Sequence, residues 1–272
     1  MEDQKTLIAG LLNICEQASS AILDVYQSAD VQVQKKSDNS PVTQADLAAH
    51  EIIKNALLEL TPSIPQLSEE DSSITFNQRQ DWSKFWCIDP LDGTKEFINR
   101  NDEFTINIAL IENHQPVLGM VYVPVTDTAY WGGTKIGAWK QTKGMNPVHI
   151  RSRPLGEKLV VAASRRHGQD KNDKILKPIL HHFRQISSKG IGSSLKMCLI
   201  AEGLADFYPR LFPTSEWDTA AGQAVVEAAG GRLVNAGNLE PLTYNEKESL
   251  ENPFFFVCGD PQFPLEEIAK RR

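Results

Sequence analysis

The sequence predicts a mixed α/β fold, combining α+β and α/β patterns, in which helices pack on two sheets. Three observations support this prediction. Helical periodicity dominates about the first 60 residues, strand-like runs joined by short turns follow, and strand and helix patterns alternate after Leu159. The early strands indicate an antiparallel sheet, and the later alternation indicates a second sheet with helical connections.

Two helices are expected near the N-terminus. Apolar residues recur at three- and four-residue spacings over residues 4–28, as they do along one face of a helix. Thr43-Gln-Ala-Asp46 has the spacing of a capping box, so a second helix should begin there and end near Leu60, before Pro62. Capping is therefore the local interpretation of Thr43 and Asp46.

The middle of the chain has the pattern of a sheet. Phe85 to Ile88 is a short apolar run that suits a buried strand. Three further runs, at residues 104–111, 117–124 and 129–132, are separated only by short turns. This spacing predicts an antiparallel meander.

The last third of the chain should contain alternating strands and helices. The expected elements are a strand at 159–163, a helix at 173–183, an extended segment at 184–187, a helix from 196 to 204, a strand at 206–208 and a helix at 217–229. We expect a single unit over residues 1–272, made of two interlocked lobes at about 1–153 and 154–272. They should meet near Arg153, with a cleft at the carboxyl end of the strand that precedes residue 89.

Composition limits the possible functions. The 272 residues allow a sizeable core, and a net charge of −7 disfavours a surface that coats a nucleic acid polymer. A small anionic substrate remains compatible, because bound cations can reverse the sign locally. We found no apolar run near the roughly 18 residues of a membrane span and no signal pattern, so we expect a cytoplasmic protein without a transmembrane segment. The four scattered cysteines should be reduced core thiols.

The segment Trp86-Cys-Ile-Asp-Pro-Leu-Asp-Gly-Thr94 carries the strongest chemical signal. An apolar strand stops at Asp89 and Asp92, and Gly93 and Thr94 then open a helix. Carboxylates are hard oxygen ligands, and amides at a helix start point toward an anion. The pattern therefore indicates a divalent metal with a phosphate. Taken alone, an Asp-Gly turn and an N-terminal threonine usually only end a strand and cap a helix.

Two other acidic positions are further candidates for the same metal site. Glu69 lies in the cluster Ser68-Glu-Glu-Asp71, and Asp218 follows Trp217 at a helix start. An isolated acidic cluster is usually a solvated loop. Separation in sequence gives no evidence that these carboxylates converge with Asp89.

Asp89-Pro-Leu-Asp-Gly-Thr94 resembles the signature of the magnesium-dependent, lithium-sensitive phosphatase superfamily that includes inositol monophosphatase. Ser-Glu-Glu, Asp-Pro-Leu-Asp-Gly-Thr and Trp-Asp occur in the order typical of that superfamily, and similarity extends over nearly the whole chain. The segments most similar to the bacterial CysQ-type 3′(2′),5′-bisphosphate nucleotidases are Leu67 to Asp71, Asp89 to Phe97, Gly192 to Lys196 and Trp217 to Gly222. The resemblance implies a layered αβαβα sandwich of the sugar-phosphatase type, with the metals in the N-terminal lobe and nucleotide contacts in the C-terminal lobe.

The resemblance also implies a metal site. One Mg²⁺ would bind Glu69, Asp89 and the backbone carbonyl of Leu91. A second would bind Asp89, Asp92 and Asp218, and a weaker third site would use Glu69 and waters. Glu69, Leu91, Asp92 and Asp218 would also border the substrate. Because four carboxylates would repel a phosphate, the metals should load before or with the substrate.

The same family pattern assigns the catalytic groups. The amides of Gly93 and Thr94 would hold the phosphate, with glycine allowing close approach. The Thr94 hydroxyl and Asp46 would orient and deprotonate the attacking water. Asp46 would then both cap its helix and act in catalysis. Glu70, an alternative for water activation, ranks below Asp46.

Nucleotide contacts are implied for Ser164, His167, Gly192 and Lys196. The local interpretation of each is weaker, since a serine after a strand is an ordinary turn former and a surface histidine usually has no special role. A Gly-Ser-Ser helix start followed by Lys196 is nonetheless a reasonable seat for an anion.

We therefore expect a Mg²⁺-dependent phosphatase that removes the 3′-phosphate of adenosine 3′,5′-bisphosphate and also acts on its sulfated analogue. By resemblance, its role would be to recycle a by-product of sulfate assimilation. An inositol monophosphatase or broad sugar phosphatase is the alternative enzyme, and an inactive nucleotide-binding regulator is the alternative from another class. Oligomeric state is left open, as is peripheral association with the cytoplasmic face of the inner membrane.

Overall fold

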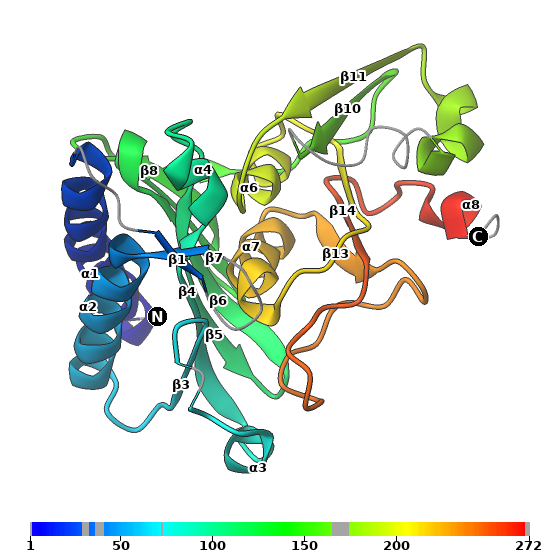
Figure 1. Cartoon of the computed structure of the whole chain (residues 1–272). Helices are drawn as coiled ribbons and strands as arrows, with labels where there is room; N and C mark the ends of the chain where they lie inside the picture. The colour runs from blue at the N-terminus through cyan, green and yellow to red at the C-terminus, as the bar shows by residue number, and fades with distance from the viewer. Residues whose placement is uncertain (1, 29–32, 36–40, 72, 165–173, 270–272) are drawn as a thin grey trace.

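The computed structural model describes residues 2–28, 33–35, 41–71, 73–164 and 174–269. Within them lie a seven-stranded sheet of order β3-β4-β5-β6-β7-β8-β9, a five-stranded sheet of order β11-β10-β12-β14-β13 and a two-stranded β1-β2 ribbon. Helices lie outside both large sheets and between them (Figure 1). The predicted αβαβα sandwich is confirmed.

Helices α1 (Glu2–Gln27) and α2 (Gln44–Leu60) cover one face of the seven-stranded sheet (Figure 1). The ribbon of β1 (Val33–Lys35) and β2 (Pro41–Thr43) precedes α2. Leu11 and Ile53 are completely buried against the sheet, in one cluster with its Ile108. The apolar periodicity of both helices thus arises from this shared core.

The start of α2 has the capping box expected from Thr43-Gln-Ala-Asp46. Thr43 Oγ1 accepts a hydrogen bond from the amide of Ala45 at 3.1 Å, and Asp46 Oδ2 accepts one from the amide of Thr43 at 2.8 Å. These bonds satisfy amides that a helix start leaves without an intrahelical partner. They also fix the Asp46 carboxylate in one orientation.

By length and composition, Lys5–Gln27 of α1 is apolar enough to cross a membrane. This is a difference from the sequence-based expectation. Ile14, Ala18 and Ile22 on this helix are buried against α2 and the sheet. A helix with one face in a protein core passes the same compositional test, and packing accounts for the apolar residues of α1 here.

The large sheet contains the predicted meander. Its strands are β3 (Gln66–Ser68), β4 (Lys84–Asp92), β5 (Thr105–Glu112), β6 (Gln115–Val123), β7 (Thr128–Gly133), β8 (Gly137–Thr142) and β9 (Val148–Ile150). All neighbours pair antiparallel except β3 and β4, which are parallel. Short helices α3 (Phe76–Arg79), α4 (Thr94–Ile98) and η1 (Pro124–Thr126) lie in its connections.

The second sheet mixes strand directions. It contains β10 (Lys158–Ala163), β11 (Gln185–Gly190), β12 (Phe207–Arg210), β13 (Arg232–Asn235) and β14 (Phe255–Cys258). Strand β10 is parallel to β11 and β12, and β14 is antiparallel to β12 and β13. Its outer face is covered by the 3₁₀ helix η2 (Lys177–His182) and by α8 (Leu265–Ala269). The helix expected at 173–183 corresponds in part to η2, which has a proline in its first turn. Residue 173 is outside the described part.

Helices α6 (Leu195–Ala201) and α7 (Glu216–Ala228) lie between the two sheets (Figure 1). Two glycines let α7 rest directly on the first sheet. A Cβ at Gly119 would lie 2.3 Å from the Ala221 carbonyl oxygen, and one at Gly132 would lie 2.8 Å from Val225 Cα. A helix from the C-terminal half of the chain therefore packs on the N-terminal sheet.

Candidate active site

Strand pairing brings Glu69 beside Asp89. Strands β3 and β4 pair with Ser68 opposite Ile88, and the amide of Glu69 continues the ladder by donating to the Ile88 carbonyl at 3.1 Å. Glu69 follows Ser68 and Asp89 follows Ile88, and both are predicted metal ligands. The parallel register therefore explains why two acids 20 positions apart in sequence meet.

A β-bulge places Asp92 in the same region. On the β5 side Asp89 is opposite Asn107 and Asp92 is opposite Thr105, so β4 contains one extra residue between the two acids. In a regular strand, residues three apart point to opposite faces. The extra residue lets Asp89 and Asp92 share one site, which a simple alternating strand could not do.

Asp218 reaches the site from the first turn of α7. Its Oδ2 accepts a hydrogen bond from the amide of Ser215 at 2.7 Å, which closes a capping box at the helix start. Carboxylate oxygens of Glu69, Asp89 and Asp218 all lie within 4.8 Å of one another. Three acids that are distant in sequence thus converge.

The electrostatics of this cluster favour a cation. Burial, followed by the charges of Glu69, Asp92 and Asp218, holds the pKa of Asp89 well above its ordinary value. Burial and the neighbouring carboxylates raise the pKa of Asp218 to about 8. The buried Asp89 Oδ2 has no hydrogen-bond donor among the residues that the structure describes. An orphaned oxygen among converging carboxylates fits a divalent metal with oxygen ligands.

Asp92 is fixed by a residue at the start of α6. Its Oδ2 accepts hydrogen bonds from the amide of Ser194 at 2.6 Å and from Ser194 Oγ at 2.7 Å. Asn107 Nδ2 donates to Ser194 Oγ at 2.9 Å and lies 3.4 Å from Asp92 Oδ2. Ser194 Oγ is also 3.0 Å from the Asp218 carbonyl oxygen. The start of α6 therefore orients one proposed ligand and contacts another.

Thr94 lies between the metal motif and Asp46. Gly93 has φ of +95°, the left-handed region that favours glycine, and α4 begins at the next residue. Thr94 Oγ1 lies 3.1 Å from Asp46 Oδ1 and 3.5 Å from the Leu91 carbonyl oxygen. Burial raises the pKa of Asp46, although hydrogen bonds from Thr43 and Thr94 oppose the shift. Asp46 thus caps α2 with one oxygen and contacts Thr94 with the other.

A cavity lies beside the carboxylates. Asp92, Gly93 and Asp218 line it, together with three of the predicted nucleotide contacts, Ser164, Gly192 and Lys196. The fourth, His167, lies outside the described residues.

Gly192 and Lys196 both have structural partners, Gly192 in the segment before β5 and Lys196 in the loop before α6. The amide of Gly192 donates to Glu103 Oε2 at 2.8 Å, and a Cβ at Gly192 would lie 2.8 Å from the Glu103 carbonyl oxygen. Lys196 Nζ donates to the carbonyls of Ser193 at 2.7 Å and Ile191 at 3.2 Å. Its burial lowers its pKa to about 8. Lys196 therefore supports the loop that holds Ser194, in addition to facing the cavity.

Sequence reasoning missed several residues of this site. Ser194 lies in the quoted Gly-Ser-Ser segment, so that motif offered a signal for it. Asn107 lies within an apolar strand and had no signal other than its polarity. Lys95 and Arg210 line the cavity as well, and no motif identified them.

The comparisons with known proteins agree with this geometry. Residues 3–269 match the inositol monophosphatase family. A 3′(2′),5′-bisphosphate nucleotidase CysQ from Escherichia coli is 48% identical over 245 residues, covering 90% of this chain and 96% of that protein. The enzyme of the same name from Haemophilus influenzae is 37% identical over 264 residues, covering 96% of each chain.

Solved structures give the same result. CysQ from Bacteroides thetaiotaomicron, described as a bacterial member of the inositol monophosphatase family, matches with a TM-score of 0.83 and 38% identity, covering 96% of this chain and 98% of that one. An IMPase from Thermotoga maritima matches with a TM-score of 0.75 and 21% identity, covering 97% and 96%, which supports the fold alone. The chain belongs to the inositol monophosphatase family, whose members generally depend on Mg²⁺. The prediction of a phosphatase of this superfamily, nearest to its nucleotidases, is confirmed.

Proposed function

We propose that this chain is a Mg²⁺-dependent 3′(2′),5′-bisphosphate nucleotidase. It removes the 3′-phosphate of adenosine 3′,5′-bisphosphate to give AMP and phosphate, and it also acts on the sulfated analogue. The observation that carries the proposal is the convergence of Glu69, Asp89 and Asp218 within 4.8 Å. It occurs in a chain that is 48% identical to a protein named as such a nucleotidase.

The donor set is suited to two Mg²⁺ ions. Glu69, Asp89 and the Leu91 carbonyl would hold one, and Asp89, Asp92 and Asp218 would hold the second. A third, weaker ion would use Glu69 and waters. When bound, the ions would neutralise the phosphate and make water a stronger nucleophile. Asp89 is the shared ligand, and a cation would satisfy its orphaned Oδ2.

The chain's own groups position the substrate and move the proton. The amides of Gly93 and Thr94 would hold the phosphate undergoing cleavage. The attacking water would donate to Thr94 Oγ1, whose own proton is directed to Asp46 Oδ1 at 3.1 Å. Because burial raises the pKa of Asp46, this carboxylate is a stronger base than an exposed aspartate. Its other oxygen stays bound to Thr43 and keeps the carboxylate in place.

Cationic side chains in the cavity support a bisphosphate substrate over inositol phosphate. Lys95, Lys196 and Arg210 line it together with the acids Asp92, Glu96 and Asp218. The metals would contact only the phosphate that is removed, so a second phosphate needs cations of its own. Ser164 and the loop at Gly192 are the proposed contacts for the rest of the nucleotide.

The experiment is phosphate release from a panel of substrates with and without Mg²⁺. The panel contains adenosine 3′,5′-bisphosphate, its sulfated analogue, AMP and inositol 1-phosphate. We expect Mg²⁺-dependent release from the first two with the highest kcat/KM, and inhibition by millimolar Li⁺. A higher kcat/KM on inositol 1-phosphate would support the alternative enzyme. Nucleotide binding with no phosphate release from any substrate would support an inactive regulator.

The proposal also covers the extent of the two lobes and the location of the protein in the cell. The lobe that supplies most of the proposed metal ligands extends over about residues 1–153, and the lobe that contacts the nucleotide and also supplies Asp218 extends over about 154–272. The location is the cytoplasm, where the predicted substrates would be formed. Membrane flotation of the tagged protein would test for association with the inner membrane.

A further inference from the structure

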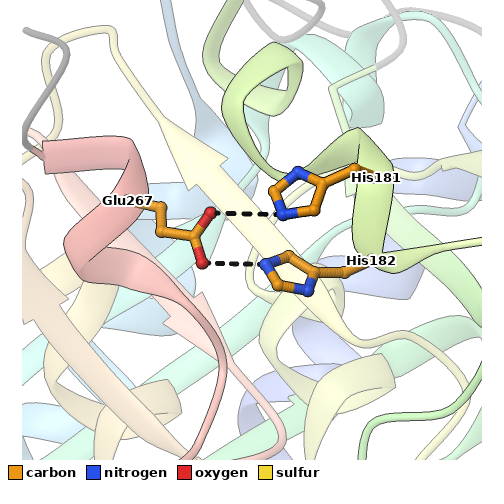
Figure 2. A group of neighbouring side chains, drawn as sticks. All are labelled: His181, His182 and Glu267. Carbon is orange, nitrogen blue, oxygen red and sulfur yellow. Dashed lines mark hydrogen bonds and ion pairs between the residues drawn. The ribbon is translucent and has the colours of Figure 1, made fainter.

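A second group of metal-binding side chains lies on the outer face of the second lobe. His181 and His182 end helix η2, and Glu267 lies on α8 (Figure 2). His182 Nε2 is 2.8 Å from Glu267 Oε1, and His181 Nε2 is 3.7 Å from Oε2. One ligand atom from each residue lies within 4.8 Å of the others. The two imidazoles therefore point at one carboxylate from the same side.

Packing beneath the cluster holds the two short helices together. Ile179 on η2 and Leu265 and Ile268 on α8 are buried in one apolar core. The ring of Phe183 stacks on that of Phe263, with centroids 6.4 Å apart and planes at 27°. The backbones that carry the three side chains are thus fixed by burial, and convergence of the side chains does not depend on the ion pair alone.

An ordinary ion pair accounts for only part of this geometry. His182 makes a hydrogen bond to Glu267, but the 3.7 Å separation of His181 from the same carboxylate is too long for one. The two imidazole rings nevertheless lie with centroids 4.0 Å apart, tilted by 38°. Two protonated rings at this spacing would repel each other. A bound cation would instead use both neutral Nε2 atoms together with the carboxylate.

We propose that His181, His182 and Glu267 bind a divalent transition-metal ion of the zinc class. Two imidazoles and one carboxylate are a usual ligand set for Zn²⁺, whereas Mg²⁺ prefers oxygen ligands. Bonds of about 2.0 Å to a tetrahedral ion bring neighbouring ligand atoms to roughly 3.3 Å apart. Ligand atoms already within 4.8 Å reach that spacing through small side-chain rotations.

The site is accessible and separate from the proposed active site. The side chains of His181, His182 and Glu267 are 65%, 39% and 41% exposed, so water can complete the coordination. Helices η2 and α8 lie on the opposite side of the second sheet from α6 and α7 (Figure 1). Metal binding would join the C-terminal helix to η2 and stabilise the fold without entering the cavity.

The experiment follows Zn²⁺ binding by histidine NMR in the full-length protein, after EDTA treatment and with saturating Mg²⁺ present. The chain has six histidines, so few ring signals need assignment. We expect the signals of His181 and His182, assigned by single alanine substitutions, to shift with about one equivalent of Zn²⁺. The melting temperature should rise in parallel.

Matched variants separate this site from binding elsewhere. Glu267→Gln should weaken Zn²⁺ binding at the two histidines at least tenfold, while Glu266→Gln, one position away and exposed, should leave it unchanged. An amide spectrum like that of the wild type would confirm that each variant is folded. The proposal is overturned if the two ring signals of the wild type stay in place at saturating Zn²⁺, or if both glutamine variants bind equally well.

Discussion

Ser194 donates both its amide and its hydroxyl to the same carboxylate oxygen of Asp92, across 102 positions of sequence. One residue at the start of α6 therefore orients a proposed metal ligand at the end of β4. Changing a partner that orients a metal ligand typically lowers metal affinity or activity by about 10-fold to 100-fold.

Ser194→Ala should weaken Mg²⁺ activation. The variant loses the hydroxyl bond to Asp92 and the contact with Asn107, so the Mg²⁺ concentration for half-maximal activity should rise about 10-fold to 100-fold. The measurement is a Mg²⁺ titration of kcat. Ser193→Ala is the matched control, because the bond to the Oγ of Ser193 within the described residues is a long one, from the Leu195 amide at 3.4 Å. Equal titration curves for both variants would contradict the positioning role of Ser194.

Asp92→Asn should remove most activity while keeping the fold. The amide retains the shape of the carboxylate and can still accept from Ser194, but one ligand of the second ion loses its charge. Activity should stay low at saturating Mg²⁺. Glu96→Gln, which alters a cavity acid outside the proposed ligand set, is the control. A near-normal kcat of folded Asp92→Asn would reject the two-metal assignment.

Thr94→Ala should lower kcat by roughly 10² to 10⁴, the usual range for a positioned acid-base group, with a smaller change in KM. The reason is loss of the hydroxyl that connects the water to Asp46 Oδ1. Thr94→Ser keeps that hydroxyl and should retain most activity. A large loss in the serine variant would indicate that the threonine methyl group, and not the proton path, is what matters.

Asp46→Asn tests whether capping or catalysis dominates at this position. If Asp46 and Thr94 act as a unit, combining Asp46→Asn with Thr94→Ala should lower kcat little more than either change alone. The capping contribution is measured separately, as a change in the free energy of unfolding, which should be small because asparagine can still accept from the Thr43 amide. Additive losses in kcat would leave Asp46 with the capping role only.

Lys196 should give a pH-dependent contribution to stability. Burial lowers its pKa in the folded protein to about 8, below the value of 10.5 for a free lysine. Between these values the unfolded chain binds more protons, so this group lowers stability below about pH 8 and the penalty fades as pH rises toward 10.5. The free energy of unfolding of wild type relative to Lys196→Met should therefore rise over that window. A constant difference from pH 7 to pH 10 would contradict the lowered pKa.

The same residue separates nucleotide recognition from loop support. If Lys196 contacts the nucleotide, Lys196→Ala should reduce kcat/KM for adenosine 3′,5′-bisphosphate about tenfold to a hundredfold, which is the range for a lost charged hydrogen bond. Inositol 1-phosphate should be nearly unaffected. Equal losses on both substrates would assign Lys196 to the loop alone, through its bonds to Ile191 and Ser193.

Much of the fold was predictable from periodicity. The meander over β5 to β7, both N-terminal helices and the Thr43 capping box are each determined by local sequence. Strands β1, β2, β3, β8, β9, β13 and β14 were not predicted. In β3 and β9, three residues with mixed polarity carry no period of their own. These strands form because a neighbouring strand offers them hydrogen bonds.

The candidate site, too, could be predicted from the sequence only in part. The motif around Asp89 and Asp92 indicated a metal, but its bulge depends on pairing with Asn107 and Thr105. The role of Ser194 depends on a contact between the start of α6 and the end of β4, which no local pattern contains. For Lys196, the sequence suggested an anion contact and could not indicate that two backbone carbonyls already bind its ammonium group.

The contact of α7 with the first sheet orders events in the nascent chain. The strands of that sheet end at Ile150, and the helix that covers its inner face begins only at Glu216. This face stays uncovered during translation until α7 leaves the ribosome. It includes Gly119 and Gly132, which have no side chains. Since Asp218 arrives on that same helix, burial of the sheet and completion of the carboxylate cluster occur together, after all strands of that sheet have been synthesised.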